Sequence, residues 1–134
     1  MRRVYLAAPL FSDAEKEFNC KLRDEIKKTG QDVFLPQEDS NNVKDIKNRQ
    51  HIIFTKNLEA IDTSELMVAV LDGADIDSGT AWEIGYAYSK GIPVFGLRTD
   101  FRTLGDEGRV NLMIERSVTM CGSIQELLNR LKSL

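Results

Sequence analysis

The chain has 134 residues, a hydrophobic fraction of 42%, a charged fraction of 29% and a formal net charge of −3. These values are ordinary for a globular protein and predict one domain spanning residues 1–134. Acidic and basic residues are interspersed, and no apolar run approaches the roughly 20 residues of a membrane span, so the sequence predicts neither nucleic-acid binding nor membrane insertion.

Short apolar runs alternate with helical patterns along the chain, beginning with a buried strand near the N-terminus. Because acidic residues follow this first run at once, the run is not typical of a signal peptide, and we expect a cytoplasmic protein. Ser12 and Glu15 have the spacing of a capping box at the start of the first helix, which Gly30 ends. Strands are expected at residues 2–8, 32–36, 65–73, 92–97 and 118–121. Helices are expected at 12–30, 43–62, 110–117 and 123–134, and a further helix ends near residue 90.

This alternation of strands and helices predicts an α/β fold with a parallel sheet and helices on both of its faces. Five strands in a short chain favour a flavodoxin-like five-stranded sheet with the order 2-1-3-4-5. Ligands of such sheets bind beyond the carboxyl ends of the strands, where the strand order reverses. The loops expected to meet there are residues 7–13 and 72–83, so the sequence predicts the functional site between them.

The cysteines and the single histidine give no sign of a metal or redox centre. Cys20 and Cys121 have no metal-binding or redox spacing, and we expect buried free thiols. No cysteine or second histidine lies near His51 in the sequence, which argues against a metal ligand. The sequence therefore predicts no metal site and no cofactor.

The loop at residues 72–83 combines a helix start with several acidic residues. Gly79 allows a tight turn, and a helix start favours anions, but Asp72, Asp75 and Asp77 would repel a phosphate. Neither a Walker motif nor a G-x-G-x-x-G motif is present. Carboxylates instead suit sugar hydroxyls, from which they accept charge-assisted hydrogen bonds.

Two acids near one site also suit glycosidic chemistry, in which one carboxylate attacks the anomeric carbon. The spacing alone favours a simpler interpretation, namely that Glu83 is a helix-start acid stabilised by the helix dipole and that Asp77 is an N-cap. Trp82 is more typical of packing at a core or rim than of a base-stacking platform. Tyr5 alternates with apolar residues on a buried strand, and its hydroxyl requires a hydrogen-bond partner such as a carboxylate at the end of the sheet.

Several stretches together resemble the nucleoside 2-deoxyribosyltransferase family. The D-S-G-T-x-x-E-I-G-x-A pattern at residues 77–87 and the Y-L-A-x-P start at residues 5–9 are the most specific, and the resemblance extends over about residues 3–120. It implies a five-stranded parallel α/β sheet. It also implies an enzyme that cleaves the N-glycosidic bond of 2′-deoxynucleosides and passes deoxyribose to another base, whereas relatives hydrolyse this bond in nucleoside monophosphates. The further matching stretches are residues 34–39, 53–73 and 109–115.

The resemblance assigns a role to the residues that match the family's motifs. Glu83 matches the nucleophile that attacks C1′ and forms a covalent deoxyribosyl-enzyme. Tyr5 matches the tyrosine that holds this carboxylate, and Asp77 matches the acid that binds the sugar 5′-hydroxyl. Gln37 lies where the family contacts the base. Further substrate contacts are expected from Phe11, Ser78 and Gly79 in the two loops at the switch point.

Asn111 and Met113 match residues that a neighbouring subunit supplies to the site. The resemblance therefore implies a homo-oligomer, at least a symmetric dimer, that shares its sites between subunits. The expected partners are small molecules, namely nucleosides and nucleobases.

Two positions bear on the choice between branches of the family. Monophosphate-cleaving relatives tend to carry a serine at the position of Asp77, so the aspartate favours free nucleosides, although a one-residue shift would present Ser78 instead. Where many members have an aspartate that helps to protonate the base, this chain has Asn57. An amide can bind a base edge, but it cannot donate a titrating proton.

The sequence therefore predicts a deoxyribosyltransferase that acts on free 2′-deoxynucleosides, with the loop at residues 98–110 as a cover that keeps water from the intermediate. A hydrolase of 2′-deoxynucleosides or of nucleoside 5′-monophosphates is the alternative among enzymes. Because of Asn57, a non-catalytic nucleotide-sensing module that kept the fold is a third hypothesis.

Overall fold

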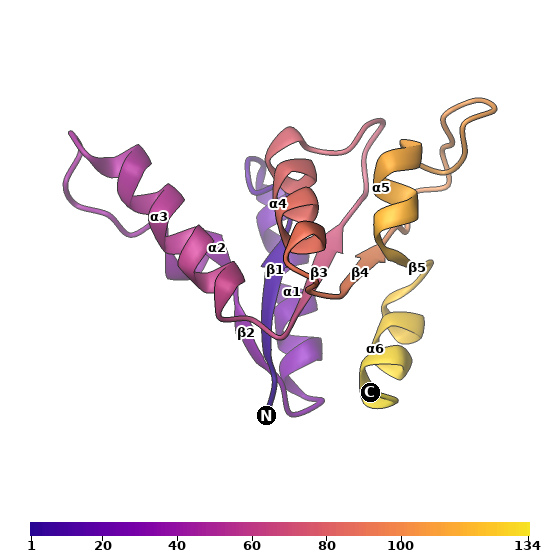
Figure 1. The fold of residues 1–134 in the computed structure, drawn as a ribbon, viewed down its shortest axis with the longest axis horizontal. Helices are drawn as coiled ribbons and strands as arrows, with labels where there is room; N and C mark the ends of the chain where they lie inside the picture. The colour runs from indigo at the N-terminus through magenta and orange to yellow at the C-terminus, as the bar shows by residue number, and fades with distance from the viewer.

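The five strands of the computed structural model, which describes residues 1–134, form one parallel sheet with the order β2-β1-β3-β4-β5 (Figure 1). This order and the α/β class confirm the prediction from the sequence. The strands are β1 (Arg3–Ala7), β2 (Asp32–Phe34), β3 (Leu66–Val70), β4 (Val94–Leu97) and β5 (Thr119–Cys121). The helices are α1 (Asp13–Lys27), α2 (Pro36–Asp39), α3 (Arg49–Asp62), α4 (Ser78–Ser89), α5 (Leu112–Ser117) and α6 (Ile124–Lys132).

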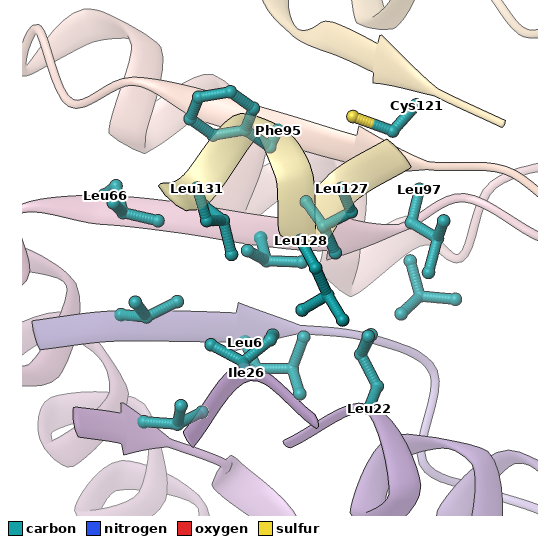
Figure 2. Packing of buried hydrophobic residues seen from close by; sticks show 14 of the residues in the cluster. Leu6, Leu22, Ile26, Leu66, Phe95, Leu97, Cys121, Leu127, Leu128 and Leu131 are labelled. Carbon is teal, nitrogen blue, oxygen red and sulfur yellow. The ribbon is translucent and has the colours of Figure 1, made fainter. Parts of the chain in front are cut away.

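The first face of the sheet is covered by α1 and α6. Their leucines and isoleucines interdigitate with alternate residues of the strands in one cluster of 15 buried residues, part of which Figure 2 shows. Leu22 and Ile26 of α1 and Leu127 of α6 lie in this cluster with Leu6 of β1. Burying each such side chain contributes roughly 1.5–3 kcal/mol. None of the 15 residues of this cluster lines the cavity at the site, so the cluster supports the sheet from the opposite face.

The second face of the sheet carries α3, α4 and α5. A cluster of 11 buried residues joins Tyr5, Ala7 and Met67 of the strands to Ile61 of α3 and Ile84 of α4. Side chains alternate along a strand, so Tyr5 points to this face while its neighbours point to α1 and α6. All five residues of β3 are buried, as expected for a central strand with helices on both faces.

The starts of α1 and α4 carry the caps predicted from the sequence. These caps also hold the two loops that were expected to border the site. Ser12 and Glu15 form a reciprocal capping box at the start of α1, and Gly30 follows that helix with φ of 89°. Asp77 is the N-cap of α4 and accepts hydrogen bonds from the backbone amide and the hydroxyl of Thr80, at 2.9 and 3.0 Å.

Two local predictions were wrong. The segment after β2, where no helix was predicted, contains the short helix α2, because Pro36 occupies its first position and Asp39 accepts from the Leu35 amide at 2.8 Å. The helix predicted to begin at residue 43 begins at Arg49. Asp45 accepts from the backbone and side-chain amides of Asn48, which holds the preceding segment in a non-helical turn.

Helix α3 extends away from the body of the molecule, at the upper left of Figure 1, and the loop at residues 98–110 lies beside α5 on the opposite side. None of the helices combines the length and the apolar character needed to cross a bilayer.

Candidate active site

A cavity of about 570 Å³ lies beyond the carboxyl ends of β1 and β3, between α3 and the start of α4. Its size is typical of a small-molecule site, and it lies where the strand order reverses. No lysine, arginine or histidine lines it, so its charge comes from two carboxylates. The lining residues are Ala8, Leu10, Phe11, Pro36, Asn41, Ile53, Phe54, Asn57, Leu58, Ile61, Asp77, Ser78, Gly79, Thr80, Trp82 and Glu83.

Glu83 and Tyr5 form a hydrogen-bonded pair at this cavity. The Tyr5 hydroxyl donates to Oε2 of Glu83, and no protein group donates to the other carboxylate oxygen, Oε1. Tyr5 is fully buried, and its ring stacks on Phe34 of β2 with centroids 5.6 Å apart. The tyrosine thus fixes one oxygen of a carboxylate whose other oxygen has no protein partner.

The environment of this pair shifts the pKa of both groups. Burial raises the pKa of Glu83 from 4.5 to about 7, the hydrogen bond from Tyr5 opposes this shift, and the charge of Asp77 adds to it. Burial and the charge of Glu83 raise the pKa of the Tyr5 hydroxyl far above its usual value, so the hydroxyl stays protonated and donates to the carboxylate. Glu83 is consequently poised between its neutral and charged forms near neutral pH.

Asp77 lies on the same side of the cavity as Glu83, at the first turn of α4. One of its oxygens, Oδ2, caps the helix through Thr80, and no protein group donates to Oδ1. Ser78 and Gly79 are exposed at the cavity, and a Cβ added to Gly79 would lie 3.4 Å from Oδ2 of Asp77. The predicted N-cap role of Asp77 is therefore confirmed, and it leaves one carboxylate oxygen available to a ligand.

Asn57 lines the opposite side of the cavity, on α3. Its amide oxygen is buried and has no hydrogen-bond partner in the protein. Because an unpaired buried amide group costs roughly 1–3 kcal/mol, this position favours a ligand that completes the hydrogen bonding.

Aromatic and aliphatic side chains complete the walls and the rim. Trp82 packs edge-on against Phe54, with centroids 5.8 Å apart, and stacks on Tyr86 at 5.5 Å. Phe11 is 74% exposed at the mouth of the cavity. An apolar mouth with carboxylates deeper inside suits a molecule with one aromatic part and one part rich in hydroxyls.

The apolar cavity residues of α3 were not predicted as part of the site. Their helical spacing in the sequence predicted a helix. Ile61 lies in the core and also lines the cavity, whereas Ile53 and Phe54, nearer the start of α3, line the cavity outside the buried core. The available signal was Asn57, a polar residue within this otherwise apolar face.

A family model for nucleoside 2-deoxyribosyltransferase matches residues 4–126 of the chain. The chain belongs to the nucleoside 2-deoxyribosyltransferase family. Tyr5 and Glu83, which form the hydrogen-bonded pair, both lie within the matched residues. No curated protein sequence matched the chain.

Solved structures agree with this family membership. A conserved protein from Enterococcus faecalis V583 is 35% identical, with a TM-score of 0.85 over 99% of this chain and 98% of that one. A 2-deoxyribosyltransferase from the psychrotolerant bacterium Bacillus psychrosaccharolyticus is 26% identical, with a TM-score of 0.83 over 95% and 90% of the two chains. The CMP N-glycosidase BcmB of Clostridium botulinum, at 20% identity and a TM-score of 0.59 over 99% and 100%, shares the fold.

Gln37, a predicted site residue of this family member, turns away from the cavity. Its amide accepts from Asn19 at 2.9 Å and donates to the Lys16 carbonyl at 3.0 Å, so its hydrogen bonds go to α1. The cause is the short helix α2, which carries Gln37 toward α1 and leaves Pro36 and Asn41 at the cavity. In this conformation Gln37 does not line the cavity, and its contact with the base stays a prediction.

Asn111 and Met113 lie outside the cavity of their own chain. Both are exposed at the start of α5, where Asn111 caps the helix and Met113 is 69% exposed. The loop at residues 98–110 contributes no lining residue either, so it does not cover the site of its own chain. In a single chain the loop packs beside α5 on the far side of α4, so its role as a cover stays a prediction (Figure 1).

The raised pKa of Glu83 predicts that this carboxylate destabilises the fold at alkaline pH. The folded chain retains a proton between about pH 4.5 and 7 that the unfolded chain has lost, so stability falls as the pH rises through this window. Replacing Glu83→Gln should therefore raise the free energy of unfolding by about 2–3 kcal/mol at pH 8 and by little at pH 4. Urea unfolding at the two pH values measures this difference.

Glu59→Gln provides the control, because Glu59 is an exposed carboxylate on α3 and its replacement should change stability little at either pH. An equal gain from Glu83→Gln at both pH values would contradict the desolvation of Glu83.

Proposed function

We propose that this protein cleaves the N-glycosidic bond of 2′-deoxynucleosides and transfers the deoxyribosyl group to another nucleobase. The observation that carries the proposal is the pair of Tyr5 and Glu83 at the cavity, in which one carboxylate oxygen is held and the other is free. Membership of the nucleoside 2-deoxyribosyltransferase family supports it. No cofactor is required for this chemistry.

In the first step, the free oxygen of Glu83 attacks C1′ of the substrate. The bond from C1′ to the base nitrogen breaks, its electron pair stays on that nitrogen, and an ester forms between C1′ and Glu83. In the second step, a nitrogen of the incoming base attacks C1′ and the ester bond breaks, which restores the carboxylate. Tyr5 keeps its proton throughout and orients the carboxylate through Oε2.

The ionised form of Glu83 is the reactive one, and its pKa of about 7 keeps much of the protein in this form at neutral pH. A raised pKa also makes the carboxylate a stronger base than an exposed glutamate, and bond formation to C1′ removes the buried charge. The same desolvation that destabilises the free carboxylate therefore assists the first step.

Asp77 is assigned to the sugar, and Ser78 and Gly79 border the same end of the cavity. The free Oδ1 of Asp77 is available to accept from the 5′-hydroxyl. A 5′-phosphate would meet the carboxylates of Asp77 and Glu83 in a cavity without a cation, which favours free nucleosides over monophosphates.

The base is assigned to the side of the cavity between Asn57 and the aromatic rim. Asn57 has both a donor and an acceptor to offer to a base edge, and Phe11, Phe54 and Trp82 offer apolar faces. Since the Asn57 amide does not titrate, the leaving base takes its proton from water or is already protonated when the nucleoside binds.

Hydrolysis is the second candidate, and the exposure of the cavity favours it. Phe11 and Trp82 are 74% and 52% exposed, and no loop of the same chain closes over Glu83, so water has access to an ester at this position. Transfer requires that this access be blocked until the second base arrives. A neighbouring subunit that brings Asn111 and Met113 to the rim would provide the missing cover.

The transferase is expected to convert deoxyinosine and free adenine into deoxyadenosine. Glu83→Ala should lower this rate at least ~10³-fold and abolish covalent labelling by a deoxyribosyl donor, since the nucleophile is removed. Glu59→Ala, which removes an exposed glutamate of α3, should leave the rate unchanged. Chromatography of the products separates the candidate reactions.

Release of free deoxyribose at a rate independent of adenine would show that the protein is a hydrolase and not a transferase. Ligand binding without turnover by the intact protein would instead indicate a nucleotide-sensing module.

Asn57→Asp is expected to raise the rate on free nucleosides, by on the order of 10-fold at pH 6, because a carboxyl group can protonate the leaving base. Asn41→Asp is the matched control, since it adds a carboxylate to the same cavity from a different segment. Steady-state rates between pH 5 and 8 measure the effect. Equal rate changes in both variants would show that added negative charge, and no proton transfer at position 57, is responsible.

A homo-oligomer with shared sites is expected in solution, at least a dimer by sedimentation. Combined replacement of Asn111 and Met113 by alanine should lower the rate at least ~10-fold, and mixing this variant with Glu83→Ala chains should restore activity at hybrid sites. A fully active monomer at all concentrations would contradict this expectation.

A further inference from the structure

Arg98 is a charged residue buried outside the cavity, at the carboxyl end of β4, with 2% of its surface exposed. Its guanidinium group donates to the backbone carbonyls of Leu71 and Gly73, at 3.0 Å for Gly73, and to the carbonyl of Arg102 at 2.9 Å. Its acidic neighbour, Asp100, lies 4.0 Å away. Arg98 thus joins the loop after β3 to the loop after β4 through backbone contacts.

Two aspartates join the same two loops, but their side chains accept hydrogen bonds, whereas Arg98 donates them. Asp72 accepts from the backbone amide and hydroxyl of Thr99, both at 2.6 Å, and from the Asp100 amide at 2.9 Å. Asp100 in turn accepts from the Gly73 amide at 3.2 Å. We refer to Asp72, Arg98, Thr99 and Asp100 as the β3–β4 loop network.

The backbone between this network and the cavity is short, and its last residue before Asp77, Ile76, is half-buried. Gly73 has φ of 117°, which allows its carbonyl to accept from Arg98 while its amide donates to Asp100. Residues 74–76 then lie against Arg98, Leu104 and Val110, with only a small void between them. Asp77 follows directly, so the network fixes the segment that ends at the N-cap of α4.

The network is better suited to orienting the backbone of the loops than to stabilising the fold. Burial of a guanidinium group that is paired mainly with backbone carbonyls is weak evidence for stability, because desolvation offsets the gain. What such a group provides is direction, since its planar donors fix several carbonyls relative to one another. Two of the carbonyls fixed here, those of Leu71 and Gly73, precede Asp77 in the loop after β3, and the third, that of Arg102, lies in the loop after β4.

We propose that the β3–β4 loop network positions Asp77 relative to Glu83, and that Arg98 and Asp72 are thereby positioning residues for recognition of the substrate's 5′-hydroxyl. This inference rests on the proposed function in one respect, the contact between Asp77 and the sugar. The geometric part, that the network sets the distance between the two carboxylates, holds for the protein without substrate.

The first test measures discrimination between 2′-deoxyadenosine and 2′,5′-dideoxyadenosine as the ratio of their kcat/KM values. Asp77→Ala should bring this ratio close to 1. Arg98→Met and Asp72→Asn should lower the ratio at least ~10-fold relative to the unaltered protein, because a displaced Asp77 no longer meets the 5′-hydroxyl. Arg116→Met is the control, since Arg116 is an exposed arginine of α5 outside the network.

The second test needs no substrate and follows the titration of the Glu83 carboxyl by carbon NMR. The groups that face Glu83 are Tyr5 of β1 and Asp77, and the charge of Asp77 raises its pKa. The midpoint should therefore fall in Asp77→Asn and, in the same direction, in Arg98→Met and Asp72→Asn. Thr99→Val, which removes one exposed hydroxyl from the network, is the milder variant should Arg98→Met not fold.

An unchanged midpoint and an unchanged substrate ratio in folded Asp72→Asn and Thr99→Val would overturn the inference. Absence of turnover with every nucleoside would overturn the proposed function, and the midpoint shift would still decide whether the network positions Asp77.

Discussion

The hydrogen bond from the Tyr5 hydroxyl to the Glu83 carboxylate constrains the whole site. It requires a tyrosine on the face of β1 that meets α4, and a glutamate in the second turn of that helix. The parallel sheet brings both to one place, because the carboxyl end of β1 and the helix after β3 adjoin at the reversal of strand order. Phe34 of β2 supports the ring of Tyr5 from the neighbouring strand.

The Glu83 carboxylate is half-buried, which costs free energy when the group is charged. A glutamate in the first turns of an exposed helix would ionise near its usual pKa and be well solvated, and it would be a weak nucleophile. Burial raises the pKa of Glu83, and the hydroxyl of Tyr5 limits this increase, so the charged form persists near neutral pH. The fold thus maintains a group that is less stable in the free protein than it would be in water.

The sequence predicted the sheet order and the location of the site because both depend on local patterns. Strand and helix periodicity gave the fold, and the Ser12 capping box and the Asp77 N-cap fixed two helix starts correctly. The orientation of Gln37 could not be predicted, because it depends on hydrogen bonds to α1 and on a short helix begun by Pro36. Tertiary contacts of this kind leave no periodic signal.

The position of the loop at residues 98–110 also depends on tertiary contacts that leave no periodic signal in the sequence. Its length and polarity were typical of a cover, but its residues pack against the segment that precedes Asp77 and lead into α5. One side of the loop therefore supports the Asp77 end of its own chain's cavity, and its continuation carries Asn111 and Met113 outward. If these residues reach a neighbour, the same segment connects two sites. Protection of the ester from water would then depend on assembly, because no part of a single chain closes over Glu83.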